Sequence, residues 1–182
     1  KLLRAYGVPC ADAQLAATPD EAAQIAIPMI AKHGSCVVKI FSRDITHKSD
    51  VSGVVLDLST PEAVREAAIA IIARARKARP HAHIQGVTVH PMVRRPNGRE
   101  LIAGIAEDPT FGPVVLFGRG GTAVEVINDK ALALPPLDMG LARGQIERTR
   151  VSRLLRSYRD KPEADIDAVA LTLVRIAQMS AD

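Results

Sequence analysis

The chain has 182 residues, 47% of them hydrophobic and 24% charged, which is the composition of a folded protein and excludes a disordered one. Aromatic residues make up only 3% and tryptophan is absent, so we expect an aliphatic core and no aromatic platform for stacking single-stranded nucleic acid. The net charge of +4 suits phosphorylated or carboxylated small molecules as well as nucleic acid, and on its own it selects neither.

Cysteine usage and hydropathy bear on the compartment of the protein. Cys10 and Cys36 have neither CxxC spacing nor a neighbouring His/Cys cluster, so we expect two free thiols and no structural zinc. No apolar run reaches the length of a membrane span, and residues 1–4 do not form a signal peptide. These features favour a cytoplasmic protein. Helical patterns occur at both ends, so we expect the chain to be part of a longer polypeptide.

Helices in the first half are predicted mainly from their starting residues. Thr18 and Thr60 are each followed by proline and an acidic residue, which is typical of a capped helix start. Pro28 is expected to kink or shorten the helix in which it lies. The predicted helices span residues 1–6, 19–33 and 61–77.

Short apolar runs rich in β-branched residues predict the strands. Proline cannot lie inside a ladder, so we expect His90–Val93 to leave the sheet after the strand that precedes it. Pro96-Asn97-Gly98 predicts a tight turn and, with it, a hairpin whose second strand begins at Glu100. The predicted strands span residues 37–41, 54–58, 84–89, 100–105, 114–117, 124–127 and 131–134.

Helical patterns return near the end of the chain. One helical region runs from Leu137 to about Ser157, and an amphipathic helix runs from Asp165 to Met179. Helices and strands therefore alternate in two blocks. We predict an α/β protein with two α+β lobes, residues 1–88 and residues 89–182.

A lysine lies inside the first apolar strand. Burying an ammonium group without a partner is costly, so Lys39, between Val38 and Ile40, points either to solvent or to an anion. Periodicity alone supports the two alternatives equally. A fixed cation on a rigid strand is a suitable contact for a nucleotide phosphate.

The loop that follows carries His47, Lys48, Ser49, Ser52 and Gly53. Taken by itself, His47 is more simply interpreted as an exposed loop histidine. A neutral imidazole can instead attack phosphorus, while the neighbouring lysine and serines stabilise the transferred oxygens. Gly53 would then permit close approach of the backbone to a phosphate.

Other polar residues are weaker candidates. Glu100, at the entry to a strand, is either an exposed carboxylate or an acceptor for ribose hydroxyls. The run Gly118–Gly121 matches neither a dinucleotide-binding nor a Walker pattern and is interpreted as a turn. Glu125 and Asp129 could hold magnesium, although such acids are more often solvated. The arginines between Arg143 and Arg159 are interpreted as a solvated basic face, with contact to an acidic partner or a coenzyme phosphate as the alternative.

An ordered set of motifs extends over nearly the whole chain. They are Tyr6-Gly7-Val8-Pro9, Val37-Val38-Lys39-Ile40, Asp44-Ile45-Thr46-His47-Lys48-Ser49-Asp50-Val51, Ser52-Gly53-Val54, Gly98-Arg99-Glu100-Leu101-Ile102, Asp108-Pro109 with Phe111-Gly112-Pro113, and Gly120-Gly121. This set resembles the ATP-grasp domain of NDP-forming (ADP-forming) acyl-CoA synthetases such as acetate–CoA ligase. Leu134-Pro135-Pro136-Leu137 is most similar to the versions fused to a GNAT protein acetyltransferase.

The resemblance implies an ATP-grasp fold, in which two lobes clamp ATP or ADP together with Mg²⁺. It also implies that His47 is catalytic and relays a phosphoryl group between a histidine on another domain and ADP or ATP. The implied nucleotide contacts are Lys39 at the phosphates, Gly53 and Val54 beneath them, the backbone of His90, Pro91, Met92 and Val93 at the adenine, and Glu100 near the ribose.

The implied partners are a CoA-binding domain that carries a phosphohistidine, in the same chain or in a separate subunit, a small acyl substrate and a possible GNAT domain. Neither nucleic acid nor a membrane is expected. Two departures from the family pattern matter. Ser52 replaces the first of two usual glycines, so the approach of the loop to phosphate is expected to differ. The closing strands of the family, which supply the magnesium ligands, are missing, so we expect a fragment that is inactive alone.

Two other functions are compatible with the sequence. One is a nucleotide- or ligand-sensing module that regulates an attached acetyltransferase without ligase turnover. The other is an interaction scaffold without a ligand. The presence of Lys39, His47 and Glu100 favours the ligase module over both.

Overall fold

The computed structural model describes residues 2–121, 124–157 and 161–182. The chain folds into two compact units, one of Ala11–Arg94 and one of Arg95–Asp182 together with the N-terminal segment up to Cys10. These units differ from the predicted division at residue 88, and the assignment of the predicted ranges to two lobes stays a prediction.

The N-terminal segment joins the second unit through its backbone and one apolar side chain. Val8 is buried in the core of that unit. Arg175 donates a hydrogen bond from Nη1 to the Gly7 carbonyl oxygen at 2.6 Å. The short helix α1 (Leu2–Ala5) ends just before Gly7, whose φ of 75° lies in the left-handed region that glycine favours.

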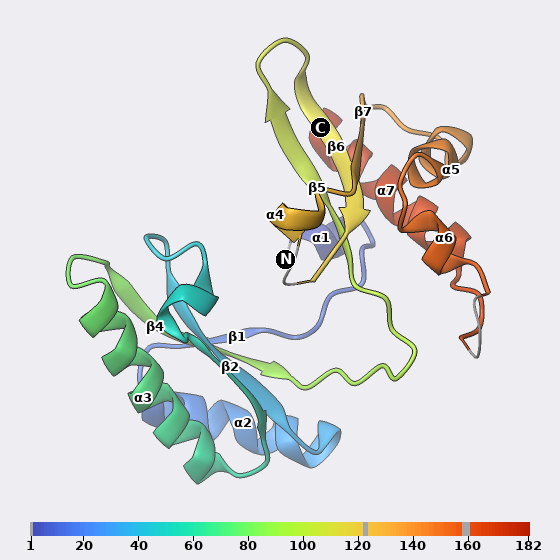
Figure 1. Cartoon of the computed structure of the whole chain (residues 1–182). Coiled ribbons are helices and arrows are strands. Elements are labelled where there is room, and N and C mark those ends of the chain that lie inside the picture. The colour runs from blue at the N-terminus through green and yellow to red at the C-terminus, as the bar shows by residue number, and fades with distance from the viewer. Residues whose placement is uncertain (1, 122–123, 158–160) are drawn as a thin grey trace. The chain divides into compact units, whose positions relative to one another are not determined.

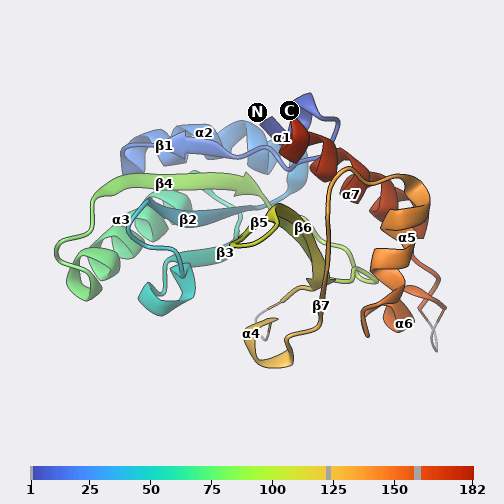
Figure 2. The ribbon, with the colours of Figure 1, turned by 90° about the horizontal axis from the view of Figure 1, so that it is seen from above.

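The unit of residues 11–94 is an antiparallel sheet with two helices on one face. Its strands lie in the order β1-β4-β2-β3, with α2 and α3 packed against one side (Figure 1), and Figure 2 shows β4 between β1 and β2. The strand bounds are β1 Gln14–Ala16, β2 Cys36–Ser42, β3 Val54–Leu58 and β4 Ile84–Pro91, and the helix bounds are α2 Pro19–His33, η1 Lys48–Val51 and α3 Pro61–Ala78.

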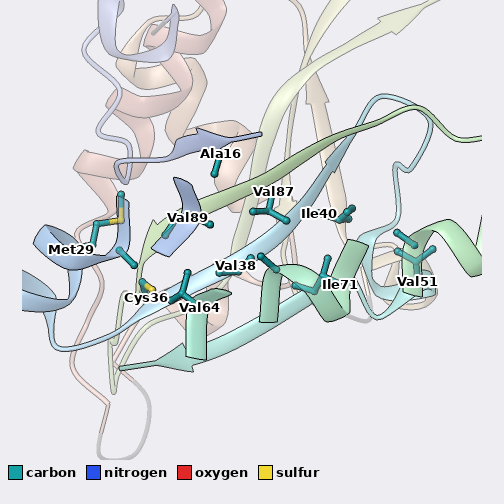
Figure 3. Packing of buried hydrophobic residues seen from close by; sticks show 14 of the residues in the cluster. Ala16, Met29, Cys36, Val38, Ile40, Val51, Val64, Ile71, Val87 and Val89 are labelled. Carbon is teal, nitrogen blue, oxygen red and sulfur yellow. The ribbon is translucent and has the colours of Figure 1, made fainter. Parts of the chain in front are cut away.

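The core of this unit lies between the sheet and its helices. Alternate residues of each strand point toward α2 and α3 and are aliphatic, as the low aromatic content predicts. The residues that Figure 3 labels in this core are Ala16, Met29, Cys36, Val38, Ile40, Val51, Val64, Ile71, Val87 and Val89.

Both predicted helix starts are confirmed. The Thr18 hydroxyl accepts a hydrogen bond from the Glu21 N–H (3.2 Å), and the Thr60 hydroxyl accepts one from the Ala63 N–H (3.1 Å). Pro28 does not shorten its helix, because α2 continues to His33.

The second unit is a three-stranded antiparallel sheet, in the order β5-β6-β7, with helices packed on one face. Val115 and Phe117 of β6 are fully buried against Ile146 of α5 and Leu173 of α7. The strand bounds are β5 Leu101–Asp108, β6 Gly112–Arg119 and β7 Lys130–Ala133, and the helix bounds are α4 Val124–Ile127, α5 Met139–Glu147, α6 Ser152–Leu155 and α7 Ile166–Ala181.

Three predictions about the strands are wrong. The strand β4 continues through His90 and Pro91, which pair with Val37 and Cys36 at the end of the ladder. The predicted hairpin across residues 96–98 does not form, because β5 pairs along its whole length with β6. The run 124–127 is a short helix, and its apolar character does not reflect burial, since Val126 is 89% exposed. The strand β1 was not predicted.

Cys10 is exposed and Cys36 is buried, and both are free, as expected. Within the part of the chain that the structure describes, no helix combines the length and the apolar composition needed to cross a bilayer.

Candidate functional site

Lys39 lies on the face of the first sheet that α2 and α3 leave uncovered. Its neighbours in β2, Val38 and Ile40, have no exposed surface and face the helices. Because successive side chains of a strand point to opposite faces, Lys39 points to the other face, which we call the open face. Val54 of β3 and Thr88 of β4 are its direct cross-strand partners and lie on the same face.

A histidine from β4 also lies on the open face. His90 is two residues beyond Thr88, and its Nε2 lies 2.9 Å from the Thr88 hydroxyl oxygen. The pKa of His90 is lowered, chiefly because the ring is partly buried and further because the positive charges of Lys39 and Lys48 disfavour a third cation nearby. The neutral imidazole is therefore its dominant form at neutral pH.

Lys39 on the open face and Lys48 on the neighbouring 3-10 helix η1 (Lys48–Val51) are the two cations that act on His90. Among the described residues, no carboxylate forms an ion pair with Lys39 or Lys48. Both lysines are half-buried, so their charges are less screened than those of fully exposed side chains. Lys39 and His90 on the sheet and Lys48 on η1 thus form a cationic site that lacks a described carboxylate and favours an anion.

His47 lies at the start of the loop that supplies Lys48. It precedes the 3-10 helix η1 with extended backbone dihedrals, and its side chain is exposed and makes no capping hydrogen bond. The ring is thus available to a reactant from outside the chain. The loop is tied to α3 because Arg74 donates a hydrogen bond to the Ser52 carbonyl oxygen at 3.0 Å.

Gly53 is required by packing. A Cβ atom on Gly53 would lie 2.6 Å from Cγ2 of Ile40 and 3.0 Å from the Lys48 carbonyl oxygen. The residue is buried, and its own carbonyl accepts a hydrogen bond from the Ile40 N–H at 2.7 Å. The left-handed conformation at this loop falls on Ser52, with φ 47° and ψ 42°.

The segment His90–Val93 has few free backbone donors. Pro91 has no N–H, and the Met92 N–H donates to the Ser35 carbonyl oxygen at 3.0 Å. The Val93 N–H makes no hydrogen bond to a residue that the structure describes. A base bound here by backbone contacts would therefore use the Val93 N–H as its donor.

Glu100 belongs to the other compact unit and lines a cleft of about 340 Å³ within it. The Gly120 N–H donates to the Glu100 carbonyl oxygen at 2.8 Å, which holds the start of β5 against the end of β6. Gly121 has a φ of 98°, which favours glycine, and a Cβ atom there would lie 2.8 Å from Oε2 of Glu100. The predicted turn at Gly118–Gly121 is therefore partly wrong, because Gly118 and Arg119 belong to β6, and only Gly120 and Gly121 follow the strand and line the cleft with Glu100.

Two arginines also line this cleft. Arg99 is structural, because it donates to the Leu154 and Pro162 carbonyl oxygens at 2.8 and 2.7 Å. The side chain of Arg119 forms no hydrogen bond or ion pair within the described ranges. Sequence reasoning did not identify Arg119 as a residue of this cleft, although its position between Gly118 and Gly120 could have indicated it.

Asp129 is a structural carboxylate, which argues against the suggested magnesium site. It accepts hydrogen bonds from the Arg150 and Val151 N–H groups, both at 2.7 Å, and its side chain is only 6% exposed. The side chain of Glu125 lies outside the description. Within the described residues, no group of three His, Cys, Asp or Glu side chains could hold a metal ion.

The arginine series is partly structural as well. Arg148 donates to the Leu132 carbonyl oxygen and Arg150 to the Ile127 carbonyl oxygen, each at 2.7 Å. Arg143 donates to Asp167 at 2.9 Å, and this hydrogen bond, with the charge of Arg143, lowers the pKa of Asp167. These three arginines stabilise loops and helix ends, yet their side chains remain exposed, as the predicted solvated basic face requires. Arg159 lies outside the described residues.

The structure brings together Lys39, Lys48, Val54 and His90, and it adds Thr88, which sequence reasoning missed. The indication was available, because Thr88 and His90 are alternate polar residues in an apolar strand and alternate residues share a face.

Comparison with known proteins gives consistent matches over the whole chain. The family model of an ATP-grasp domain matches residues 1–182. An acetate–CoA ligase (ADP-forming) I of Archaeoglobus fulgidus is 37% identical over 181 residues, which cover all of this chain and 26% of the relative. The beta subunit of acetate–CoA ligase (ADP-forming) II of Pyrococcus furiosus is 35% identical over 186 residues, covering all of this chain and 75% of the subunit.

Solved structures give the same result. The dinucleotide forming acetyl-coenzyme A synthetase 1 of Ca. Korarchaeum cryptofilum, in complex with coenzyme A, Ca-AMPCP and HgCl⁺, matches with a TM-score of 0.87 at 34% identity, over 98% of this chain and 76% of that one. The same synthetase with coenzyme A and Mg-AMPPCP, its phosphohistidine segment pointing towards the nucleotide binding site, matches with a TM-score of 0.74 at 30% identity, over 99% of this chain and 75% of that one.

These matches confirm the predicted mixed α/β ATP-grasp fold. None of the relatives described here is named as an acetyltransferase, so the regulatory alternative gains no support from them. The chain spans about a quarter of the Archaeoglobus relative and three quarters of the Pyrococcus subunit. It belongs to the ATP-grasp domain family and is homologous to the ATP-grasp module of ADP-forming acetate–CoA ligases.

Proposed function

We propose that the chain is the nucleotide-binding module of an ADP-forming acyl-CoA ligase. The open face of the first sheet would bind the phosphates of ADP or ATP, with Lys39 as the fixed cation. The observation that carries this proposal is that Lys39 and Lys48 lie half-buried beside His90 with no described carboxylate as partner. Such a site gains most from an anion with several negative charges.

The reaction would be a phosphoryl transfer through histidine. A phosphohistidine on a CoA-binding domain, in the same protein or in a partner subunit, would deliver the phosphoryl group to His47, whose exposed ring projects from a loop held by Arg74. An oxygen of the β-phosphate of ADP then attacks this phosphorus, so that the P–N bond breaks, the P–O bond forms and ATP results. The neighbouring Lys48 would stabilise the oxygens of the transferred group.

We assign further nucleotide contacts to residues near Lys39, to the segment 90–93 and to Glu100. Val54 shares the open face with Lys39, and Gly53 is buried beneath it. The Val93 N–H is the remaining donor of the segment 90–93 for adenine. Glu100, at its own cleft, would accept hydrogen bonds from ribose. Mg²⁺ would bind to the phosphates of the nucleotide. The described residues include no group of acidic, histidine or cysteine side chains that could hold it directly.

Calorimetric titration of ADP with Mg²⁺ tests the proposal in the full-length protein that carries this chain. Lys39→Ala should weaken binding more than tenfold, or about 1.4 kcal/mol. Lys32→Ala, in the last turn of α2, removes the same charge from an exposed position and should leave the affinity unchanged. Equal affinity for the wild type and Lys39→Ala would show that the open face is not the phosphate site.

The role of His47 requires a separate assay. His47→Asn should keep ADP binding within about twofold and abolish ATP formation from acyl-CoA, phosphate and ADP, because the ring is the proposed phosphoryl carrier. His33→Asn, on the last turn of α2, is the matched control and should retain turnover. Full activity of His47→Asn would exclude the relay.

A further inference from the structure

Among the described residues of the open face, His90 is the one whose side chain can gain a charge near neutral pH. Its Nε2 lies 2.9 Å from the Thr88 hydroxyl oxygen, so the pair fixes the ring on the sheet. Val37, its cross-strand partner in β2, is apolar and buried. The ring is therefore held by a hydrogen bond on a rigid strand and not by a flexible loop.

The charged groups that face His90 are cations from two other elements. Lys39 is on β2 and Lys48 is on η1, and both act on the ring. On its other side, β4 pairs with β1, in which Gln14 lies opposite Val89. The residues that precede Gln14 are Ala13 and Asp12, and of these only Asp12 titrates, although the lowered pKa of His90 is caused by burial and by the two lysines. The helices α2 and α3 pack on the opposite face of the sheet.

We propose, resting on the proposed function, that the His90 side chain is a proton-dependent ligand of the bound polyphosphate, and that it takes up one proton from solvent when the phosphates bind beside Lys39 and Lys48. In the free protein, burial of the ring and the charges of the two lysines oppose its protonation. Bound phosphates neutralise the lysines and add negative charge, which reverses the balance. Nε2–H then donates to the Thr88 hydroxyl, and Nδ1–H is free to donate to a phosphate oxygen.

The pH dependence follows from linkage. The complex binds more protons than the free protein in the range between the lowered pKa of free His90 and its higher pKa in the complex. Nucleotide affinity should therefore rise as the pH falls through this range, by at most tenfold per pH unit. The protein would hold ADP or ATP more tightly in a more acidic medium.

Proton uptake can be measured directly. ADP is titrated calorimetrically at one pH in buffers of different protonation enthalpy, with the full-length protein that carries this chain. The slope gives the protons taken up per ADP. Because ADP itself titrates in this range, the decisive quantity is the difference in protons taken up per ADP between the wild type and His90→Gln. In this variant the amide can still form a hydrogen bond with Thr88 but cannot be protonated.

We expect the wild type to take up more protons per ADP than His90→Gln, by a fraction that approaches one at the pH of largest effect. His33→Asn should match the wild type. Pyrophosphate should reproduce the uptake and adenosine should not. Equal proton numbers for the wild type and His90→Gln would overturn the inference while leaving the nucleotide site intact. Uptake with adenosine alone would overturn the assignment of the phosphates as the partner.

Two outcomes separate this inference from the proposed function. If neither ADP nor pyrophosphate binds, the proposed function fails and the inference fails with it. If His90→Gln does not fold, nuclear magnetic resonance titration of the wild-type His90 ring still decides the question. The pKa of that ring should rise on addition of ADP, and an unchanged pKa with ADP bound would contradict the proposal.

Discussion

A Cβ atom on Gly53 would lie 2.6 Å from Cγ2 of Ile40, in the core of the first unit. The Ile40 N–H also donates to the Gly53 carbonyl oxygen at 2.7 Å. The glycine is therefore what allows the His47 loop to close onto β2. Its conformational freedom is not used, because the left-handed residue of the loop is Ser52.

Gly53→Ala should destabilise the protein by about 1–3 kcal/mol, the usual cost of overpacking a core. Denaturant unfolding without nucleotide measures this cost. Gly104→Ala is the control, because a Cβ atom there meets nothing within 4 Å and its φ is ordinary. Unchanged stability together with weaker ADP binding would instead support close approach of Gly53 to phosphate.

Ser52→Gly should stabilise the protein by about 1 kcal/mol. The left-handed region disfavours residues with a side chain by roughly 1–2 kcal/mol, although glycine loses more chain entropy on folding. Thermal unfolding should show a higher Tm for Ser52→Gly and no gain for Ser49→Gly, which lies inside η1. A lower Tm for Ser52→Gly would mean that the side chain contributes to the loop.

The parts of the fold that sequence predicted are those determined locally. Thr18 and Thr60 bond to N–H groups three residues away, so capping chemistry alone locates both helix starts. The predicted hairpin at Pro96-Asn97-Gly98 failed because a turn does not choose the partner of a strand. The partner of β5 is chosen by an uninterrupted antiparallel ladder with β6, from Leu101 to Asp108.

The same distinction applies to the candidate site. The apolar neighbours of Lys39 in β2 predicted that its side chain points to solvent or to an anion, and alternation in β4 would have placed Thr88 and His90 on one face. That this face adjoins Lys39 follows only from the pairing of β2 with β4. The role of Asp129 could not be predicted, because its hydrogen-bond donors, Arg150 and Val151, follow more than twenty residues later in the chain. Contacts between residues that are far apart in the sequence depend on tertiary packing, which the local sequence pattern does not reveal.

Asp129→Ala should destabilise the protein by about 1–3 kcal/mol, because two backbone N–H groups would lose their acceptor. It should leave the magnesium dependence of ADP binding unchanged, since this carboxylate is committed to the start of α6. Glu107→Ala removes an acid from an exposed position of β5 and should change stability by less than about 0.5 kcal/mol. A shifted magnesium requirement in Asp129→Ala would restore the metal role.

His90 should also make stability depend on pH. Its pKa is lowered in the folded chain, whereas an unfolded histidine titrates near 6.5. As the pH falls below that value, the unfolded chain binds the proton first, so the free energy of unfolding decreases until the lowered pKa is passed. Above the unfolded pKa this contribution is fully favourable.

Denaturant unfolding of the wild type and of His90→Gln at several pH values isolates this effect, because the other titrating groups are common to both. The wild type should lose stability relative to His90→Gln as the pH falls below about 6.5, the ordinary histidine value. The loss should shrink when ADP is present, because bound phosphates favour the imidazolium. A difference between the two proteins that is constant with pH would show that neither burial nor the charges of Lys39 and Lys48 hold the ring against protonation.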